Sequence, residues 1–448
     1  MVSLTLLIVV VFVIGYLCIA LEGFTKINKA AIALLMFVGC WTLFMINPGE
    51  YIAGLTPETT ASTIAGIIDH HLGGTAETLF FLMGAMTIVE VVDKNGGFNF
   101  VRDILQTRGK RTLLWRIVFI TFFLSAILDN LTTSIVMIMV LRKLVPNHKD
   151  RMIYASLVII AAISGGSFSP IGDVSTIMLW NKGVITAAGV LEEIFIPSLV
   201  SMIIPTLLLQ RSLIGELALV DSNMATDYEV LDFSKTRRKI IFALGVGGLI
   251  FVPIFKSITH LPPFVGILLV LGVLWTATEI FYRAEHGDNE GIKNRVANLI
   301  ANIEMSTILF FLGILMAVAC LEEIKVLENL GIWLNDVSAG NHFVVTGIIG
   351  VLSSIVDNVP LVAGCMGMYT VTPTGDMAVD GIFWQLLAYC AGVGGSILII
   401  GSAAGVVVMG LEKITFGWYM KHITWIAFVG YLAGIVSYWV IRTFLWVA

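Results

Sequence analysis

The sequence predicts an all-α integral membrane protein whose two halves repeat one plan. Of the 448 residues, 58% are hydrophobic and only 13% are charged, too few charged side chains to cover a soluble globule of this length. The apolar residues form blocks of about 15 to 25, whereas outer-membrane barrels show alternating segments of about ten. Polar motifs also recur at an offset of about 229 residues, which indicates an internal repeat.

Charge and cysteine usage exclude several other classes. The formal net charge is −5 and the basic residues form short, scattered clusters, so no nucleic-acid-binding surface is expected. The five cysteines lie in or beside apolar segments, without CxxC or Cys/His ligand spacing. Neither a disulfide framework, nor a zinc site, nor a cofactor is therefore expected.

The apolar blocks predict the membrane-embedded segments. They are roughly 2–21, 30–47, 76–93, 113–145, 152–181, 194–210, 240–256, 263–282, 305–320, 343–371, 382–411 and 418–445. Block 113–145 has basic clusters at both ends, which a single crossing would place on opposite sides of the membrane. We expect a re-entrant hairpin with Asp129-Asn130 at its tip, because arms of about 15 residues are too short to cross. Block 343–371 has the same design around Asp357-Asn358.

Treating both blocks as hairpins leaves ten crossings. Most of the 26 Lys and Arg residues, Lys29 among them, then fall on the cytoplasmic side, and both termini are expected on the outer side. The halves, 1–210 and 240–448, each contain five crossings and one hairpin, and 211–239 is expected to be a cytoplasmic linker. An odd number of crossings inserts the second copy upside down, which is the inverted-topology plan of secondary transporters.

In each half, the crossing that follows the hairpin is broken by glycines. The breaks contain Gly165-Gly166 and Gly172 in the first half, and Gly394-Gly395 and Gly401 in the second. We expect both breaks at the membrane midplane, where freed backbone groups are tolerated only inside protein or beside a watery cavity. Unwound carbonyls, carboxylates, amides and hydroxyls are the oxygen ligands that a small hard cation needs, about five or six of them.

The predicted site combines these oxygen-bearing side chains. The expected cation- and proton-binding residues are Asp129, Asn130, Thr132, Thr133, Asp173, Ser175, Thr176, Asp357, Asn358 and Ser396, with Na⁺ itself at Asp129, Asn130, Asp173, Thr176, Asn358 and Ser396. The expected supporting residues are Ser164, Ser167, Ser169, Ser353, Ser402, Glu77 and Glu304. Because a bare charge at membrane depth is costly, protonation competes with the cation for the same carboxylate oxygens, which predicts ion-for-proton exchange.

Plainer interpretations exist for several of these residues. Each Asp-Asn pair is also a suitable helix cap. Glu77 and Glu304 occupy comparable places in the two halves and suit either a proton path or an interfacial cap. The pair His70-His71 is expected in a solvated outer loop.

Four segments resemble NhaD-type Na⁺/H⁺ antiporters of the ion transporter superfamily, which also contains arsenite exporters and dicarboxylate or citrate carriers. These segments are 125–134, 169–176, 307–315 and 394–405. The resemblance implies a homodimer with a moving transport domain that exports Na⁺, and usually Li⁺, in exchange for H⁺ across a bacterial plasma membrane. The family's important polar positions match Asp129, Asn130, Asp173, Ser175, Thr176, Ser353, Asn358 and Ser396, whereas Ile163 and Ile399 stand where polar residues are common.

Two rival functions remain open. A relative that carries a dicarboxylate, citrate or arsenite is the nearer one, although Asp129 and Asp357 would repel a dianion. An intramembrane aspartyl protease also needs two embedded aspartates. Its Gly-x-Gly-Asp signature is missing, since Pro170 stands where the first glycine would be. We therefore expect a secondary transporter and not an enzyme.

Overall fold

The computed structural model describes residues 4–20, 27–52, 56, 59–97, 105, 107–213, 215–217, 233–286, 296–301, 303, 305–355 and 357–445. Glu304 and most of the expected linker lie outside these residues. The named elements are all helices, as the sequence predicts, because a helix satisfies its own backbone polar groups in lipid. The longer ones in the first half are α1 (Leu4–Ala20), α3 (Lys29–Phe44), α4 (Thr60–Lys94), α6 (Lys110–Ser125), α7 (Asn130–Leu144), α8 (His148–Ser167), α9 (Val174–Lys182) and α10 (Ala187–Leu209).

The second half supplies the remaining helices. They are α11 (Lys235–Thr259), α12 (Pro263–His286), α13 (Val296–Ile300), α14 (Met305–Glu323), α15 (Val326–Val337), α16 (His342–Ser353), α17 (Asn358–Met368), α18 (Ile382–Gly394), α19 (Ala403–Glu412), α20 (Phe416–His422) and α21 (Thr424–Val440). By length and composition, α4, α10, α11, α12, α14 and α21 can each cross a membrane. The chain is therefore a multi-pass membrane protein.

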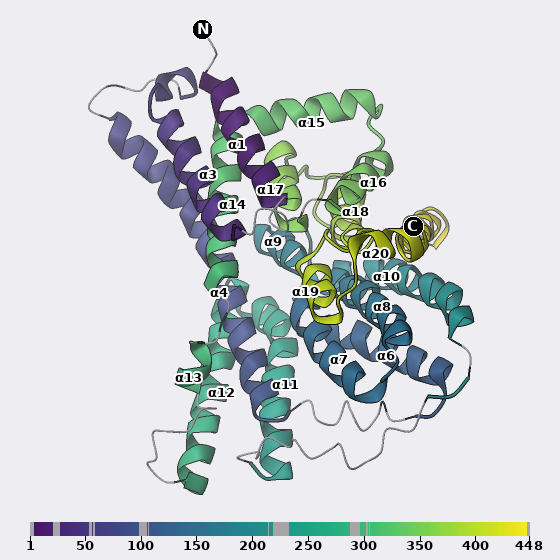
Figure 1. Ribbon diagram of the computed structural model, residues 1–448. Coiled ribbons are helices and arrows are strands. Elements are labelled where there is room, and N and C mark those ends of the chain that lie inside the picture. Colours follow the sequence, from purple (N-terminus) through teal and green to yellow (C-terminus); the bar gives the residue numbers. More distant parts are fainter. Residues whose placement is uncertain are drawn as a thin grey trace.

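The helices form two groups that lie side by side in Figure 1. The first group contains α1, α3, α4 and α11 to α14, and the second contains α6 to α10 and α16 to α21. Each group thus draws helices from both halves of the chain. The groups meet where α4 packs on α9 and where α14 packs on α17, while α15 lies across one end and contacts both α14 and α17.

The predicted hairpins and breaks correspond to pairs of short helices. Helices α6 and α7 are joined by four residues, 126–129, and α16 and α17 by 354–357. Helix α8 ends at Ser167 and α9 begins at Val174, while α18 ends at Gly394 and α19 begins at Ala403. Both predicted helix breaks are therefore present. Their depth in the membrane, and the re-entrant path of the hairpins, stay predictions.

The two halves make matching contacts between hairpin and broken helix. The Ser125 hydroxyl donates to the Ala162 carbonyl at 2.6 Å, and the Ser353 hydroxyl donates to the Ala391 carbonyl at 2.6 Å. The backbones also approach closely in the same places, because a Cβ at Gly165 would overlap the Phe122 carbonyl. At Gly394 a Cβ would overlap the Gly350 carbonyl in the same way. Only glycine permits this approach, so the repeated glycines determine how closely each broken helix packs on its hairpin.

Helix α4 corrects the expected third span. The sequence suggested a span over 76–93 after a solvated loop, but α4 begins at Thr60, so His70 and His71 lie within a helix. The reason is packing against α14: the His71 Nε2 atom lies 2.8 Å from the Glu323 Oε1 atom, and Thr75 is buried against Met316. These tertiary contacts outweigh the local polarity of the segment.

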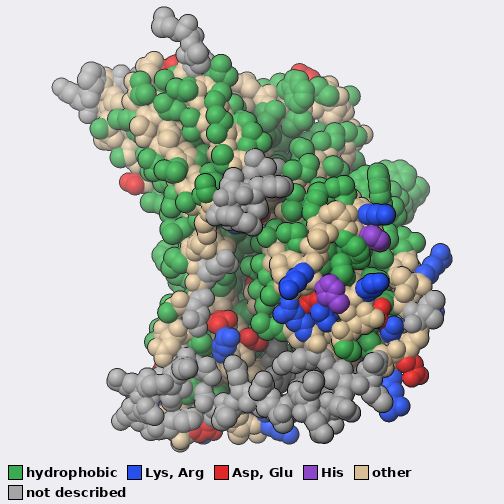
Figure 2. All heavy atoms as spheres, in the orientation of Figure 1, with side chains coloured by type: hydrophobic (Ala, Val, Ile, Leu, Met, Phe, Trp, Pro, Cys, Tyr) green, Lys and Arg blue, Asp and Glu red, His purple; other side chains and the backbone are tan. Residues whose placement is uncertain are grey.

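A buried acid joins the end of α19 to α7 and α8. The Glu412 side chain is fully buried and accepts hydrogen bonds from Arg142 Nε at 2.7 Å and Arg151 Nε at 2.5 Å. The ring of His148 lies 2.8 Å from the Glu412 carbonyl oxygen. Figure 2 shows Lys, Arg and His side chains gathered over this part of an otherwise largely hydrophobic face. The cluster connects the two halves within the second helix group.

Candidate functional site

The site centres on Asp173, the residue directly before α9. Asp173 is 4% exposed. The Asn130 side-chain amide donates to Asp173 Oδ1 at 2.9 Å, and the Asn358 amide donates to Asp173 Oδ2 at 2.8 Å. The Ser175 hydroxyl also donates to Asp173 Oδ2. One buried carboxylate is therefore shared by the tips of both hairpins, and these donors compensate its charge.

In both Asp-Asn pairs the aspartate and the asparagine make different kinds of contact. Asp129 caps α7, since its Oδ1 accepts from the Thr132 amide at 2.8 Å and its Oδ2 from the Thr132 hydroxyl at 2.8 Å. Asp357 caps α17 with a longer bond of 3.5 Å from the Val359 amide. Each aspartate thus serves its own helix, as the plainer interpretation expected, while the asparagine beside it reaches across to the shared acid.

The backbone of Asp129 adopts an uncommon conformation. Its φ of 151° and ψ of 160° fall in a region that is open almost only to glycine. Such a conformation costs on the order of 1–3 kcal/mol and persists only where the surroundings hold it. The capping bonds from Thr132 and the packing of the hairpin tip supply that support.

Two buried hydroxyls on the helices that carry these residues have no hydrogen-bond partner among the described residues. They belong to Thr133, on the first turn of α7, and Thr176, on the first turn of α9. Both side chains are fully buried. A buried polar atom without a partner is costly, and it is available to an ion or water that enters the site.

The other predicted serines make contacts within the helix framework. Ser396 donates to the Val393 carbonyl at 2.8 Å, and its own carbonyl accepts from the Tyr419 hydroxyl at 2.8 Å, which joins α18 to α20. The remaining contacts are Ser164 with the Ser201 hydroxyl, Ser167 with the Ile163 carbonyl, Ser169 with the Ile171 amide, Ser353 with the Ala391 carbonyl and Ser402 with the Gly405 amide. The bonds of Ser164 and Ser353 join different helices, whereas those of Ser167, Ser169 and Ser402 lie within four residues of the chain.

Of the two predicted glutamates, the structure describes only Glu77. Glu77 is on α4, close enough to Lys256 on α11 for the two charges to attract. Lys256 donates to the Trp180 carbonyl in the last turn of α9 at 2.9 Å, and its ammonium lies 4.4 Å from the centre of the Trp180 ring. Glu77 therefore belongs to the boundary between the two helix groups, and Glu304 lies outside the described residues.

Sequence reasoning missed the partner of Asp357. The Lys29 Nζ atom lies 3.5 Å from Asp357 Oδ2, and the same ammonium lies 4.3 Å from the centre of the Phe310 ring. We interpreted Lys29 only as a marker of membrane orientation. A lysine at the end of an apolar block gives no local signal of which distant acid it meets.

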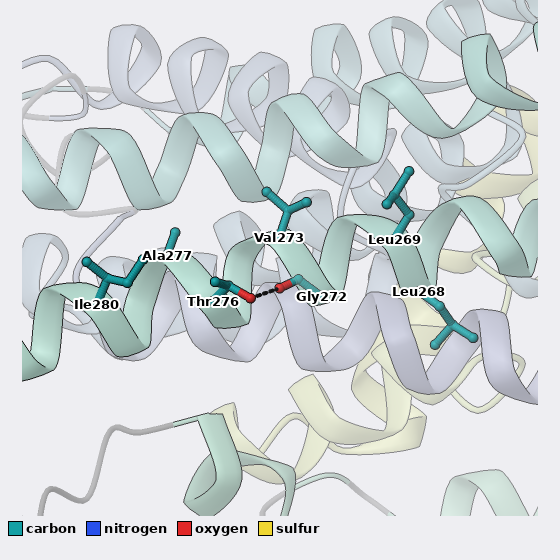
Figure 3. Close-up of a pocket in the computed structure, with 7 residues that line it drawn as sticks. All are labelled: Leu268, Leu269, Gly272, Val273, Thr276, Ala277 and Ile280. Carbon is teal, nitrogen blue, oxygen red and sulfur yellow. Dashed lines mark hydrogen bonds between the residues drawn. The ribbon is translucent and has the colours of Figure 1, made fainter.

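One surface groove lies apart from this site. Figure 3 shows a groove lined by α12 alone, with the residues Leu268, Leu269, Gly272, Val273, Thr276, Ala277 and Ile280. The lining is apolar apart from Thr276, whose hydroxyl donates to the Gly272 carbonyl at 2.8 Å. Its lining contains no ionisable group and no predicted site residue.

The apolar helices and the comparisons with known proteins together define a multi-pass helical membrane protein of the transporter class. A family model described as a citrate transporter matches residues 16–388. The chain is 44% identical to sodium/proton antiporter 1 of Arabidopsis thaliana, over 95% of this chain and 71% of that protein. It is also 41% identical to sodium/proton antiporter 2 of the same plant, over 97% and 99% of the two chains.

A bacterial relative is more distant. The Na⁺/H⁺ antiporter NhaD of Vibrio cholerae is 28% identical over 95% of this chain and 89% of that protein. The chain thus belongs to the citrate transporter family and, within it, is related to the NhaD-type Na⁺/H⁺ antiporters. The resemblance seen in the sequence motifs is confirmed. Since the relatives come from both plants and bacteria, location in a bacterial plasma membrane stays a prediction.

Proposed function

We propose that the protein exchanges Na⁺ for H⁺ at Asp173. The observation that carries this proposal is the convergence of Asn130 and Asn358, from the two hairpin tips, on one buried carboxylate. An asparagine amide offers a donor on one side and a carbonyl oxygen on the other. In the structure the donors face Asp173, and rotation of either amide would turn an oxygen toward an incoming cation.

The rotated site has the oxygen ligands that Na⁺ or Li⁺ requires. Asp173 supplies the charge, the two asparagines supply carbonyl oxygens, and Ser175 and Thr176 supply hydroxyls, of which that of Thr176 is unpartnered among the described residues. That set approaches the five or six oxygens of a hard-cation site. A proton on Asp173 removes the charge that attracts the cation, so one carboxylate binds either the cation or the proton, and exchange follows.

Movement of the second helix group against the first would expose the site to alternate sides of the membrane. Asp173 lies where the groups meet, since it precedes α9, which packs on α4, and bonds the first residue of α17, which packs on α14. The matching contacts of the two halves support an inverted repeat with re-entrant hairpins. We extend the proposal to a homodimer with both termini on the outer side.

Citrate or another dicarboxylate is the second candidate substrate, because the matching family model is described as a citrate transporter. The site favours a cation over an anion. Asp129, Asp173 and Asp357 all lie at or beside the hairpin tips, and their charges would repel a carboxylate substrate.

The test uses everted membrane vesicles from a host without its own antiporters, acidified inside and followed with a pH-sensitive dye. Addition of Na⁺ or Li⁺ should collapse the gradient in the wild type and fail to do so in Asp173→Asn. The matched control is Glu285→Gln. Glu285 lies on α12 and its carboxylate is 2.8 Å from the Arg237 guanidinium of α11, so this variant also loses one acid but should keep the response. If Asp173→Asn still responds, or if only citrate acts, cation exchange at Asp173 is refuted.

A further inference from the structure

The ion pair between Lys29 and Asp357 joins the two helix groups at the edge of the site. Lys29 is the first residue of α3 in the first group, and Asp357 precedes α17 in the second. The two atoms lie 3.5 Å apart, and the side chains are only 24% and 20% exposed. The partly desolvated setting strengthens the attraction relative to a pair in water.

Two contacts place the Lys29 ammonium next to the proposed cation site. The Lys29 ammonium lies 4.3 Å from the centre of the Phe310 ring, a cation–π contact with α14, which packs on α17. Asp357 is followed directly by Asn358, whose amide bonds Asp173 at 2.8 Å. A cation bound by the Asn358 oxygen therefore enters next to the carboxylate that Lys29 already occupies.

Resting on the proposed exchange, we propose that Lys29 is an internal competitor of the transported cation for Asp357. The ammonium compensates Asp357 and connects α17 with α3 and α14. An arriving Na⁺ is attracted by Asp357 and repels the ammonium, so the pair weakens as the site fills. Because the pair is also a contact between the groups, cation binding loosens the boundary that has to shift during transport. Lys29 is thus a positioning residue that links occupancy to movement.

The competition predicts opposite effects for the two partners. In the vesicle assay at one fixed pH, Lys29→Met should lower the apparent KM for Na⁺ by about fivefold or more, because Asp357 is then free to attract the cation. Asp357→Asn should raise the apparent KM, because an attractive charge is lost. A pair that served only stability would shift both variants in the same direction. Lys29→Arg keeps the charge and should stay near the wild-type value.

Lys256 provides a matched control. It is also a lysine of the first group, lies over an aromatic ring and contacts the second group, but its bond is to the Trp180 carbonyl and not to an acid at the hairpin tip. Lys256→Met should leave the apparent KM near that of the wild type. If it lowers the KM as Lys29→Met does, or if Lys29→Met leaves the KM unchanged or raises it, the competition is refuted.

The outcomes separate this inference from the proposed function. Failure of the exchange itself shows as a wild type without a Na⁺ response, or as an active Asp173→Asn variant. Failure of the competition shows only in the Lys29 and Asp357 variants of a working exchanger. If Lys29→Met does not reach the membrane, Lys29→Gln is measured in the same way, with the same lower KM expected.

Discussion

Gly172 controls how closely Asp173 approaches the hairpin tip, and Gly172→Ala tests that control. A Cβ at Gly172 would lie 2.7 Å from the Ser125 carbonyl oxygen and 2.8 Å from the Gly166 Cα. Ordinary contact begins at 3.4 Å. The segment that carries Asp173 therefore has to move by about 0.7 Å to accept the added methyl group.

This movement is large enough to break a bond of the site. The Asn130 to Asp173 bond is now 2.9 Å long, and a displacement directly away from Asn130 lengthens it to about 3.6 Å, beyond hydrogen-bond range. Loss of a hydrogen bond to a charged group costs about 1.5–3 kcal/mol. In the proposed cation site the same displacement separates the Asp173 carboxylate from the Asn130 carbonyl oxygen, so that the two can no longer hold one cation together. Loss of a cation contact of similar energy corresponds to roughly a 10- to 100-fold rise in the apparent KM for Na⁺. Overpacking should remove a further 1–3 kcal/mol, approximately, from folding stability.

The KM is measured in the vesicle assay, and stability by thermal unfolding of the detergent-solubilised protein. The control is Gly247→Ala on α11, where an added Cβ meets nothing within 4 Å. It should leave transport unchanged and stabilise the helix by about 0.5–1 kcal/mol. A Gly172→Ala protein with the wild-type KM and the wild-type Tm would refute the close-approach argument.

Two further substitutions test the surrounding framework. Asn130→Ala removes the carbonyl oxygen that Asn130 offers to the cation in the proposed site, together with its bond to Asp173. It should raise the apparent KM for Na⁺ about tenfold, with little change in Tm; an unchanged KM would remove Asn130 from the site. Glu412→Ala leaves Arg142 and Arg151 without their buried acid and should destabilise the protein by about 3–5 kcal/mol. This loss appears as a lower Tm, and an unaltered Tm would show that the cluster contributes little.

Local patterns predicted the elements well where they depend on neighbouring residues. The apolar blocks, the glycine breaks after Ser167 and Gly394, and the hairpin turns at both Asp-Asn pairs follow from composition and short-range preferences. The same patterns failed for α4, where polar residues around His70 suggested a loop. Its contacts with α14 come from residues more than 200 positions away, which no window along the sequence contains.

The sequence by itself determined the class of the protein, the positions of the hairpins and breaks, and the polar residues of the site. Only the tertiary structure decided their roles. Asp129 caps its own helix through Thr132, three residues away, whereas Asn358 reaches Asp173 across 185 positions. Lys29 likewise meets Asp357 from a distant helix. Capping is a short-range interaction that a motif encodes, but the partner of a side chain that leaves its own helix depends on how the helices pack.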